Sequence, residues 1–242
     1  MDLQQTKELI AEACRILGNL NLTKESNGHV SARLEGTDQI LIRARGPEEE
    51  GVRFTTAREV ITVDLDGQKI DGPEGLERPY EVFIHTWLYK TRPEVKSVVH
   101  IHPPTVVLFT ICNKPLLPLY GAYDPGALRL CQEGIASYKR SILIANDERG
   151  KDLAESMGDK RACLMRGHGI TTVGKSVQEA TITAIKLNEL AEMNYRANLL
   201  GRPEPIPEED IKAFSQMEQR GGVGWERLAS TWRYYSRLVG GR

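Results

Sequence analysis

Two histidines at alternate positions, His100 and His102, constrain this chain more than any other feature. They lie in the short run Val98–His102, whose other members are apolar, and Pro103 follows. Such a run favours a β-strand, in which successive side chains point to opposite faces. The spacing therefore predicts that both imidazoles project from one face, where their nitrogens could bind one divalent metal ion. Two polar residues on the solvated face of an ordinary strand are the other interpretation of this pattern taken alone.

The length and composition describe a globular protein of ordinary polarity. The chain has 242 residues, 40% hydrophobic and 27% charged, enough for one large domain with or without an appended tail. The formal net charge of −1 gives no electrostatic reason to expect a nucleic acid partner. We expect no membrane partner either, because no apolar run approaches a membrane span and the first residues do not resemble a signal peptide. The cysteines lack a C-x-x-C pair, which is typical of reduced thiols in a cytoplasmic protein; they are Cys14, Cys112, Cys131 and Cys163.

Hydrophobic periodicity, caps and turn residues predict alternating helices and strands. Ser176 opens a long helix with Glu179 as its capping-box partner, and Gly201 ends it. The other expected helices are 3–18, 79–92, 104–112 and 151–157, and the expected strands are 39–45, 60–65, 97–102, 141–145 and 162–165. Since these elements do not form a clean βαβ repeat, we expect a layered α/β sandwich with a largely antiparallel sheet.

The last part of the chain differs from the rest. We expect residues 1–201 to form the main domain and residues 202–242 to form a helical, aromatic-rich extension. Three prolines between residues 203 and 207 predict a stiff connector, and the glycines of 221–224 a flexible one. An extension with this aromatic content should pack on its own domain or on a neighbouring subunit; its aromatic residues are Trp225, Trp232, Tyr234 and Tyr235.

The histidines and one glutamate form the main candidate site. The chain has five histidines, and His168 lies between two glycines that let the backbone turn sharply. Glu81 lies in the first turn of the helix before the His100 strand, so it could fold back toward that strand. Three imidazoles with an open position have the composition of a catalytic divalent-metal site. Glu81 has a second interpretation, as a carboxylate that favours the positive end of its helix.

Four sequence motifs in this order resemble the class II aldolase/adducin family. They are N-G-H-V-S, E-x-x-x-H-x-x-x-Y, V-V-H-I-H-P and R-G-H-G-I, and the resemblance runs from about Asn27 to Leu200. It implies a three-layer α/β/α sandwich, a metal bound by His100, His102 and His168, and Glu81 as the catalytic acid/base. It also implies a homotetramer with sites between subunits. The expected cofactor is one divalent ion per chain, zinc or manganese first, with cobalt and iron compatible with three histidines.

Three departures from the family's sugar-phosphate aldolases indicate a different substrate. Those aldolases hold phosphate with loops rich in glycine and serine, whose backbone N–H groups are accessible. Here a histidine stands in the first loop, a polar Arg45–Gly51 loop replaces the second, and Arg78-Pro79-Tyr80 replaces the third. Bulky Pro-Tyr cannot form an equivalent cradle. We therefore expect an unphosphorylated substrate.

The groups at these positions suit a planar carboxylated substrate, and the chain resembles the decarboxylase branch of the family. That branch implies a decarboxylase of ortho-hydroxylated aromatic or pyridine dicarboxylates, such as dihydroxyphthalate or hydroxy-methylpyridine-dicarboxylate. The expected substrate-binding residues are His29, Ser31, Arg45, Tyr120 and Tyr123. Their other interpretations are a turn cap for the histidine, a surface charge for the arginine, and packing for the tyrosines. His85 is expected to hydrogen-bond behind the metal site, not to bind the ion.

In the implied reaction Glu81 protonates the ring carbon that loses carbon dioxide, while the metal spreads the developing charge as a Lewis acid. This needs a proton on Glu81 near neutral pH, which burial favours and the metal's charge opposes. One alternative is an aldolase or epimerase acting on an unphosphorylated hydroxy-carbonyl compound. Another is an adducin-like interaction module, although such domains lack the metal histidines that this chain keeps.

Overall fold

The structure is a computed structural model that describes residues 2–121, 123–219 and 225–240. The glycine-rich connector predicted at 221–224 and the side chain of Trp225 lie outside the described residues. Within them, a mixed sheet of eight strands has the order β4-β3-β2-β1-β5-β8-β7-β6. The strands are β1 His29–Arg33, β2 Ile40–Arg43, β3 Val60–Val63, β4 Lys69–Asp71, β5 Ser97–Ile101, β6 Ala136–Tyr138, β7 Ala162–Met165 and β8 Gly169–Gly174.

Every neighbouring pair in this sheet is antiparallel except β6 and β7, which are parallel. The largely antiparallel sheet predicted from the sequence is therefore confirmed. The helices are α1 Leu3–Asn19, η1 Val52–Phe54, η2 Ala57–Glu59, α2 Val82–Thr91, α3 Pro104–Ile111, α4 Pro125–Glu133, α5 Asp147–Met157, α6 Val177–Leu200, α7 Glu208–Gln219 and α8 Trp225–Leu238.

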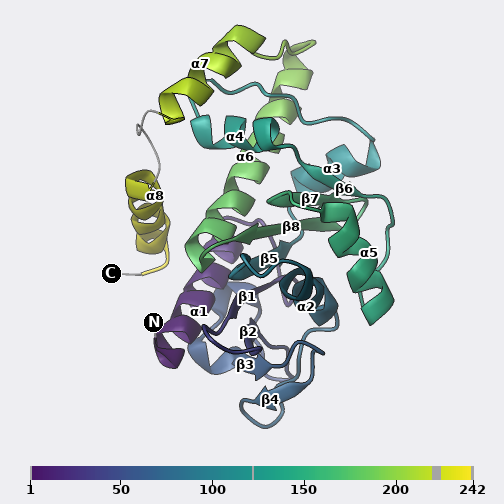
Figure 1. Ribbon diagram of the computed structural model, residues 1–242, viewed down its shortest axis with the longest axis vertical. Coiled ribbons are helices and arrows are strands. Elements are labelled where there is room, and N and C mark those ends of the chain that lie inside the picture. The colour runs from purple at the N-terminus through teal and green to yellow at the C-terminus, as the bar shows by residue number, and fades with distance from the viewer. Residues whose placement is uncertain (1, 122, 220–224, 241–242) are drawn as a thin grey trace.

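Two apolar clusters, one on each face of the sheet, create the three layers. Val99 and Ile101 of β5 pack in the cluster formed with α1, α3 and α6. Val98, one residue away, packs in the cluster formed with α2 and α5. This separation follows from the period of two along a strand. The helices of the two outer layers lie on opposite sides of the sheet in Figure 1, so the predicted three-layer α/β/α sandwich is confirmed.

The C-terminal helices pack on the same chain. Tyr235 of α8 is buried in the cluster with α1 and α6, and its hydroxyl donates to Glu189 Oε1 at 3.1 Å. Ser236 hydrogen-bonds to Glu12 of α1. In α7, the backbone carbonyl of Ile211 accepts from Gln132 of α4 at 3.1 Å. Helix α8 therefore packs on α1 and α6, and α7 packs on α4.

The strand predicted at residues 141–145 is wrong. The strand at this edge of the sheet is β6, Ala136–Tyr138, and residues 141–145 form neither helix nor strand. The stretch does alternate, since Ile144 is buried while Leu143 is 57% exposed. However, the Ile144 N–H donates to the Glu81 carboxylate at 2.8 Å instead of pairing with a neighbouring strand.

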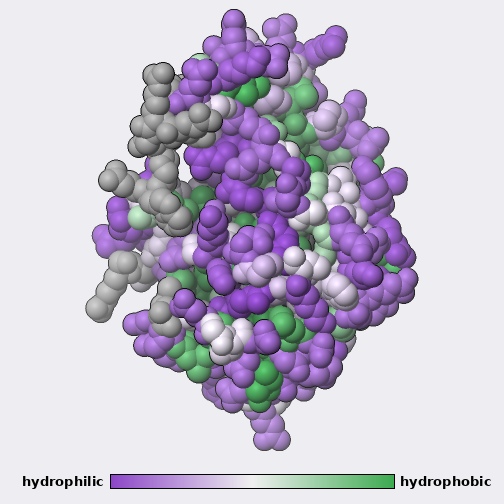
Figure 2. Space-filling model, in the orientation of Figure 1, coloured by the Kyte–Doolittle hydropathy of each residue, from purple (hydrophilic) through white to green (hydrophobic). Residues whose placement is uncertain are grey.

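Among the helices that the structure describes, none combines the length and the apolar character needed to cross a membrane. Figure 2 shows hydrophilic residues over most of the face turned to the viewer, with apolar residues in smaller separate areas.

Candidate metal centre

A row of polar side chains crosses three adjacent strands on the sheet face beneath α2. In the antiparallel register His29 of β1 is paired with His100 of β5, which is paired with Thr171 of β8. Paired residues on neighbouring strands project from the same face. The side chains of His29, His100 and Thr171 therefore lie side by side on the face that α2 and α5 otherwise fill with apolar residues.

Four side chains from four segments converge at one end of this row. Atoms that could bind a metal in Glu81, His100, His102 and His168 all lie within 4.8 Å of one another. The Nε2 atoms of His100 and His102 are 2.9 Å apart. Glu81 Oε2 lies 3.5 Å from His100 Nε2 and 3.3 Å from His168 Nε2. The structure thus brings together the three histidines and the glutamate that the sequence singled out.

The donor set of this centre fits a divalent cation. Both ring nitrogens of His168 are buried; Nδ1 has no hydrogen-bond partner among the described residues, and Nε2 faces only Glu81 Oε2 at 3.3 Å, which is unfavourable for an imidazole without a ligand. His100 Nδ1 lies 3.2 Å from Thr171 Oγ1, whose own proton points toward Met165 Sδ at 3.3 Å. His100 Nδ1 must then donate, so its Nε2 presents a lone pair to the centre.

Burial favours the neutral form of His100 and His102, which is the form that binds metal. Burial is the main reason that the pKa of His102 is lowered to about 3, and the neighbouring His100 and His168 add to the effect. Burial likewise lowers the pKa of His100. Three imidazole nitrogens close together, beside a carboxylate, could hold a divalent ion.

Glu81 is held in place from both sides. Its Oε1 accepts the Ile144 N–H, while its Oε2 faces His100 and His168. Burial acts to raise the pKa of this carboxyl, but hydrogen bonds and charge interactions with His100 and His168 outweigh it and hold the pKa below its usual range. In this arrangement Glu81 is a carboxylate at neutral pH.

The helix that carries Glu81 begins later than predicted. It starts at Val82, so Glu81 stands at the residue before the helix, with φ −94° and ψ 27°. From there its carboxylate reaches the histidines of the centre, whereas His85, one turn into the helix, contacts His29 and Ser31. The two side chains therefore contact different neighbours.

A second polar group lies behind the centre and connects α2 to β1. His85 Nε2 lies 2.6 Å from His29 Nδ1, and His85 Nδ1 lies 2.6 Å from Ser31 Oγ. Ser31 Oγ lies in turn 2.8 Å from the Tyr89 hydroxyl. All four side chains are buried. We call this set the α2–β1 chain; sequence reasoning missed Tyr89 as a member, although its spacing of four from His85 was a usable signal.

Ser31 does not reach the open part of the site. It is fully buried, and both of its hydroxyl contacts are with residues of α2. His29, by contrast, lies at the end of the α2–β1 chain nearest the metal centre, and its ring centroid is 5.2 Å from that of His100 in a stacked arrangement. Of these two predicted substrate-binding residues, the structure leaves only His29 beside the metal centre.

Arg45, Tyr120 and Tyr123 lie apart from the four converging groups. Arg45 Nε donates to the Arg78 carbonyl at 3.1 Å, and its guanidinium lies 4.0 Å from the centre of the Tyr80 ring. Tyr120 and Tyr123 stack at 5.4 Å and line a cavity of about 770 Å³ between α4, α6 and α8. None of the described residues that line this cavity belongs to the metal centre.

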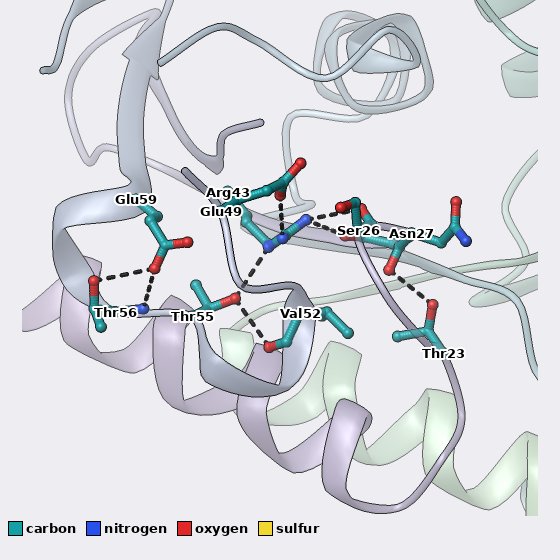
Figure 3. A network of polar contacts seen from close by, with 10 residues as sticks. Thr23, Ser26, Asn27, Arg43, Glu49, Val52, Thr55, Thr56 and Glu59 are labelled. Atoms are coloured by element: carbon teal, nitrogen blue, oxygen red, sulfur yellow. Dashed lines mark hydrogen bonds and ion pairs between the residues drawn. The ribbon is translucent and has the colours of Figure 1, made fainter. Parts of the chain in front are cut away.

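Arg43 fixes the turn that leads into His29 (Figure 3). Its buried guanidinium donates to the carbonyls of Ser26 at 3.0 Å and Gly28 at 3.2 Å, and it pairs with Glu49 at 2.6 Å. Gly28 has φ +87°, and a Cβ there would lie 2.9 Å from Thr23 Oγ1. The turn thus needs glycine for both its conformation and its close contacts.

Comparisons with known proteins identify the family. Residues 8–195 match the family described as Class II Aldolase and Adducin N-terminal domain. The 3,4-dihydroxyphthalate decarboxylase of Arthrobacter keyseri is 36% identical over 93% of this chain and 95% of its own length. A protein of the same name from Rhodococcus jostii (strain RHA1) is 36% identical over 80% of each chain.

A solved structure supports the fold. The aldolase II superfamily protein from Pseudomonas syringae superimposes with a TM-score of 0.84, covering 98% of this chain and 92% of its own, at 24% identity. At that identity the likeness speaks for the sandwich alone. The family match over most of the chain and the relatives at 36% identity carry the further conclusion. This chain belongs to the class II aldolase and adducin family, and within it to the branch of carboxy-lyases.

Proposed function

We propose that this protein is a metal-dependent decarboxylase of an ortho-hydroxylated aromatic or pyridine dicarboxylate, with a dihydroxyphthalate as the first candidate. The observation that carries the proposal is the convergence of Glu81 with three imidazoles, whose candidate ligand atoms all lie within 4.8 Å of one another. The names of the relatives at 36% identity point to the same substrate class. The intact centre also argues against an adducin-like module without catalytic activity.

The proposed cofactor is one divalent ion per chain, zinc or manganese, held by His100, His102 and His168. A bound ion would act as a Lewis acid that stabilises negative charge developing on the substrate's ring oxygen. The residues fit this role because His168 Nδ1 has no hydrogen-bond partner among the described residues, His168 Nε2 faces the Glu81 carboxylate, and His100 Nε2 presents a lone pair. Thr171 supports the ligand from behind, as partners of metal-binding histidines commonly do.

Glu81 is the proposed acid/base. During decarboxylation the bond between the ring carbon and the carboxylate breaks, carbon dioxide leaves, and the ring carbon accepts one proton. Glu81 Oε2 faces the centre and can carry that proton, while Oε1 stays held by the Ile144 N–H. Since Glu81 rests as a carboxylate, it must first take up a proton. The ring hydroxyl of the substrate can supply one, and a proton from solvent restores that hydroxyl afterwards.

The surroundings of the centre suit a carboxylate better than a phosphate ester. His29 is the proposed contact for a substrate carboxylate, because it lies beside His100 at the end of the polar row. Where a phosphate loop would lie, Arg45 stacks on Tyr80 and hydrogen-bonds to the Arg78 carbonyl. These side chains fill the segment with an aromatic ring and a guanidinium instead of exposed backbone N–H groups.

A homotetramer with sites between subunits is part of the proposal. It would explain why Tyr120 and Tyr123 line a cavity away from the metal centre of their own chain. It also fits the large apolar side chains that the single chain leaves exposed, including Leu108, Ile111 and Leu143. The four unpaired cysteines support the proposed cytoplasmic location.

The deciding experiment measures carbon dioxide release from a small panel of ortho-hydroxylated aromatic and pyridine dicarboxylates. We expect release from at least one dihydroxyphthalate by the metal-loaded protein and none from phthalate, which lacks the ring hydroxyl. Glu81→Gln should retain the metal and lose the release. If the panel is inert while an unphosphorylated ketol gives an aldehyde, the protein is an aldolase and the proposal is wrong.

A further inference from the structure

We propose that Ser31, His85 and Tyr89 are positioning residues that fix the tautomer of His29, so that Nε2 of His29 carries the proton and faces the substrate. The tautomer follows from contacts within the α2–β1 chain. Its chemical consequence rests on the proposed function, since a substrate carboxylate is the group that a donor at this place would bind.

The hydrogen-bond geometry of the α2–β1 chain is compatible with two arrangements of its protons. The contacts from Tyr89 through Ser31 and His85 to His29 measure 2.8, 2.6 and 2.6 Å, and each is short enough to be a hydrogen bond. A neutral imidazole carries one proton, so each ring donates at one nitrogen and accepts at the other. All the protons in the chain must therefore point in one direction, either toward His29 or toward Tyr89.

The Tyr89 end of the α2–β1 chain decides in which direction the protons point. If the protons pointed toward Tyr89, its hydroxyl would accept from Ser31 and would need an acceptor for its own proton. The recorded hydrogen-bond contacts of this hydroxyl are with Ser31 Oγ and the backbone N–H of Val98, and an N–H cannot accept the Tyr89 proton. An unpaired hydroxyl at a residue that is 1% exposed is unfavourable. With the protons pointing toward His29, Tyr89, Ser31 and His85 each have an acceptor, and the one donor without a partner is His29 Nε2 at the other end of the set.

This direction determines which ring nitrogen of His29 carries the proton and which accepts a hydrogen bond. Tyr89 donates to Ser31, Ser31 donates to His85 Nδ1, and His85 Nε2 donates to His29 Nδ1. His29 must then carry its proton on Nε2, which has no partner in the described part of the chain. The described buried side-chain atoms that lack a hydrogen bond do not include His29 Nε2. This nitrogen therefore keeps some exposure to solvent.

An N–H at this place attracts a carboxylate, and a lone pair would repel it. His29 thus gives the site a fixed donor, set by residues that never touch the substrate. The preset direction also removes the need to reorganise the ring when a substrate binds.

The test is a direct measurement of the tautomers. The full-length, zinc-loaded protein is labelled with ¹⁵N-histidine, and long-range ¹H–¹⁵N spectra are recorded; with five histidines in the chain, the spectrum is simple. The His29 signals are assigned by their loss in His29→Asn. We expect Nε2 of His29 to be protonated and Nδ1 to be an acceptor. A protonated Nδ1 in the wild type would overturn the inference.

Variants separate positioning from a general structural effect. Ser31→Ala removes the donor to His85, so we expect a mixture of His29 tautomers and about tenfold weaker binding of phthalate, used as an unreactive dicarboxylate probe. Ser31→Thr keeps the hydroxyl and should restore both. The matched control is Ser97→Ala on the adjacent strand, which loses an equally buried hydroxyl bonded to the Ser31 carbonyl at 2.7 Å. It should change neither measurement.

Each outcome decides one question. An unchanged tautomer in Ser31→Ala, or an equal loss of phthalate binding in Ser97→Ala, contradicts the positioning role. If Ser31→Ala does not fold, the wild-type spectrum alone decides. Because the spectrum requires no turnover, a protein with the expected tautomer and no carbon dioxide release refutes the proposed function only. Release with the opposite tautomer refutes this inference only.

Discussion

The backbone N–H of Ile144 donates to Glu81 Oε1 at 2.8 Å, across 63 positions in the sequence. This contact fixes one carboxylate oxygen and leaves the other facing His100 and His168. It also explains why an apolar, alternating stretch is not a strand. The amide that would pair with a neighbouring strand instead supports the only carboxylate among the four converging groups.

The first prediction concerns metal content. The purified protein should contain about one divalent ion per chain by elemental analysis, and His100→Ala should contain none. His85→Asn is the matched control, because His85 is an equally buried histidine outside the four converging groups. Metal at 100 times its Kd should stabilise the wild type by about 2.7 kcal/mol and leave His100→Ala unchanged. A metal-free, active wild type would contradict the assignment.

Glu81→Gln should separate metal binding from turnover. The amide oxygen can still accept the Ile144 N–H, so the side chain should keep its place. Because the amide cannot exchange a proton at this position, kcat should fall by about 10²–10⁴-fold, the usual contribution of general acid–base catalysis. Metal content and thermal stability in the same preparation are the control. Turnover within threefold of the wild type would exclude Glu81 as the acid/base.

Arg43→Met should be strongly destabilising. The guanidinium is 2% exposed and satisfies two backbone carbonyls and Glu49, so its removal leaves buried polar groups unpaired. We expect a loss of about 3–5 kcal/mol, as for a broken buried ion pair, measured by urea denaturation at fixed protein and metal concentration. Arg53→Met is the control: Arg53 is exposed and bonds Asn19, and its loss should lie within about 0.5 kcal/mol.

The metal-free protein should lose stability as the pH falls below about 6.5. The pKa of His85 and of His102 is lowered to about 3, burial being the first cause for each. Unfolded histidines take up protons near pH 6.5, so between these values the unfolded state binds more protons and the free energy of unfolding decreases with falling pH. The limit is about 1.4 kcal/mol per pH unit for each histidine.

The useful range for this measurement is pH 6.5 to 5, above the titration of ordinary carboxylates. The urea midpoint of the metal-free protein should fall across it, and His102→Asn, with one fewer titrating ring, should show a smaller slope. A flat midpoint in the wild type would show that these imidazoles are already protonated in the folded state.

The oligomeric state can be measured directly. We expect light scattering coupled to size-exclusion chromatography to give four times the mass of one chain. The exposed apolar side chains of the single chain, such as Leu143 at 57%, should then be protected in hydrogen exchange or surface-labelling experiments. A monomer with full activity would contradict the proposed sites between subunits.

Much of the fold could be predicted because its signals are local. The period of two placed Val99 and Ile101 on one sheet face and His100 on the other, and the Ser176 cap and Gly201 bounded α6 correctly. Residues 141–145 failed because alternation shows that a segment is extended but not whether it finds a strand partner. The start of α2 failed by a few residues because the turn at Pro79–Glu81 depends on contacts with the rest of the site.

The sequence by itself determined the family, the layered fold, and the set of His100, His102, His168 and Glu81, because fixed residue types in a fixed order carry that information. Only the tertiary structure decided how these groups meet. His100–Ile101–His102 became part of a centre because β5 lies between β1 and β8, which align His29 and Thr171 with His100. The α2–β1 chain, the support from Ile144 and the separate location of the two tyrosines depend on packing between distant segments. Spacing along a chain cannot encode such contacts, because they arise from the register of strands and the placement of helices on the sheet.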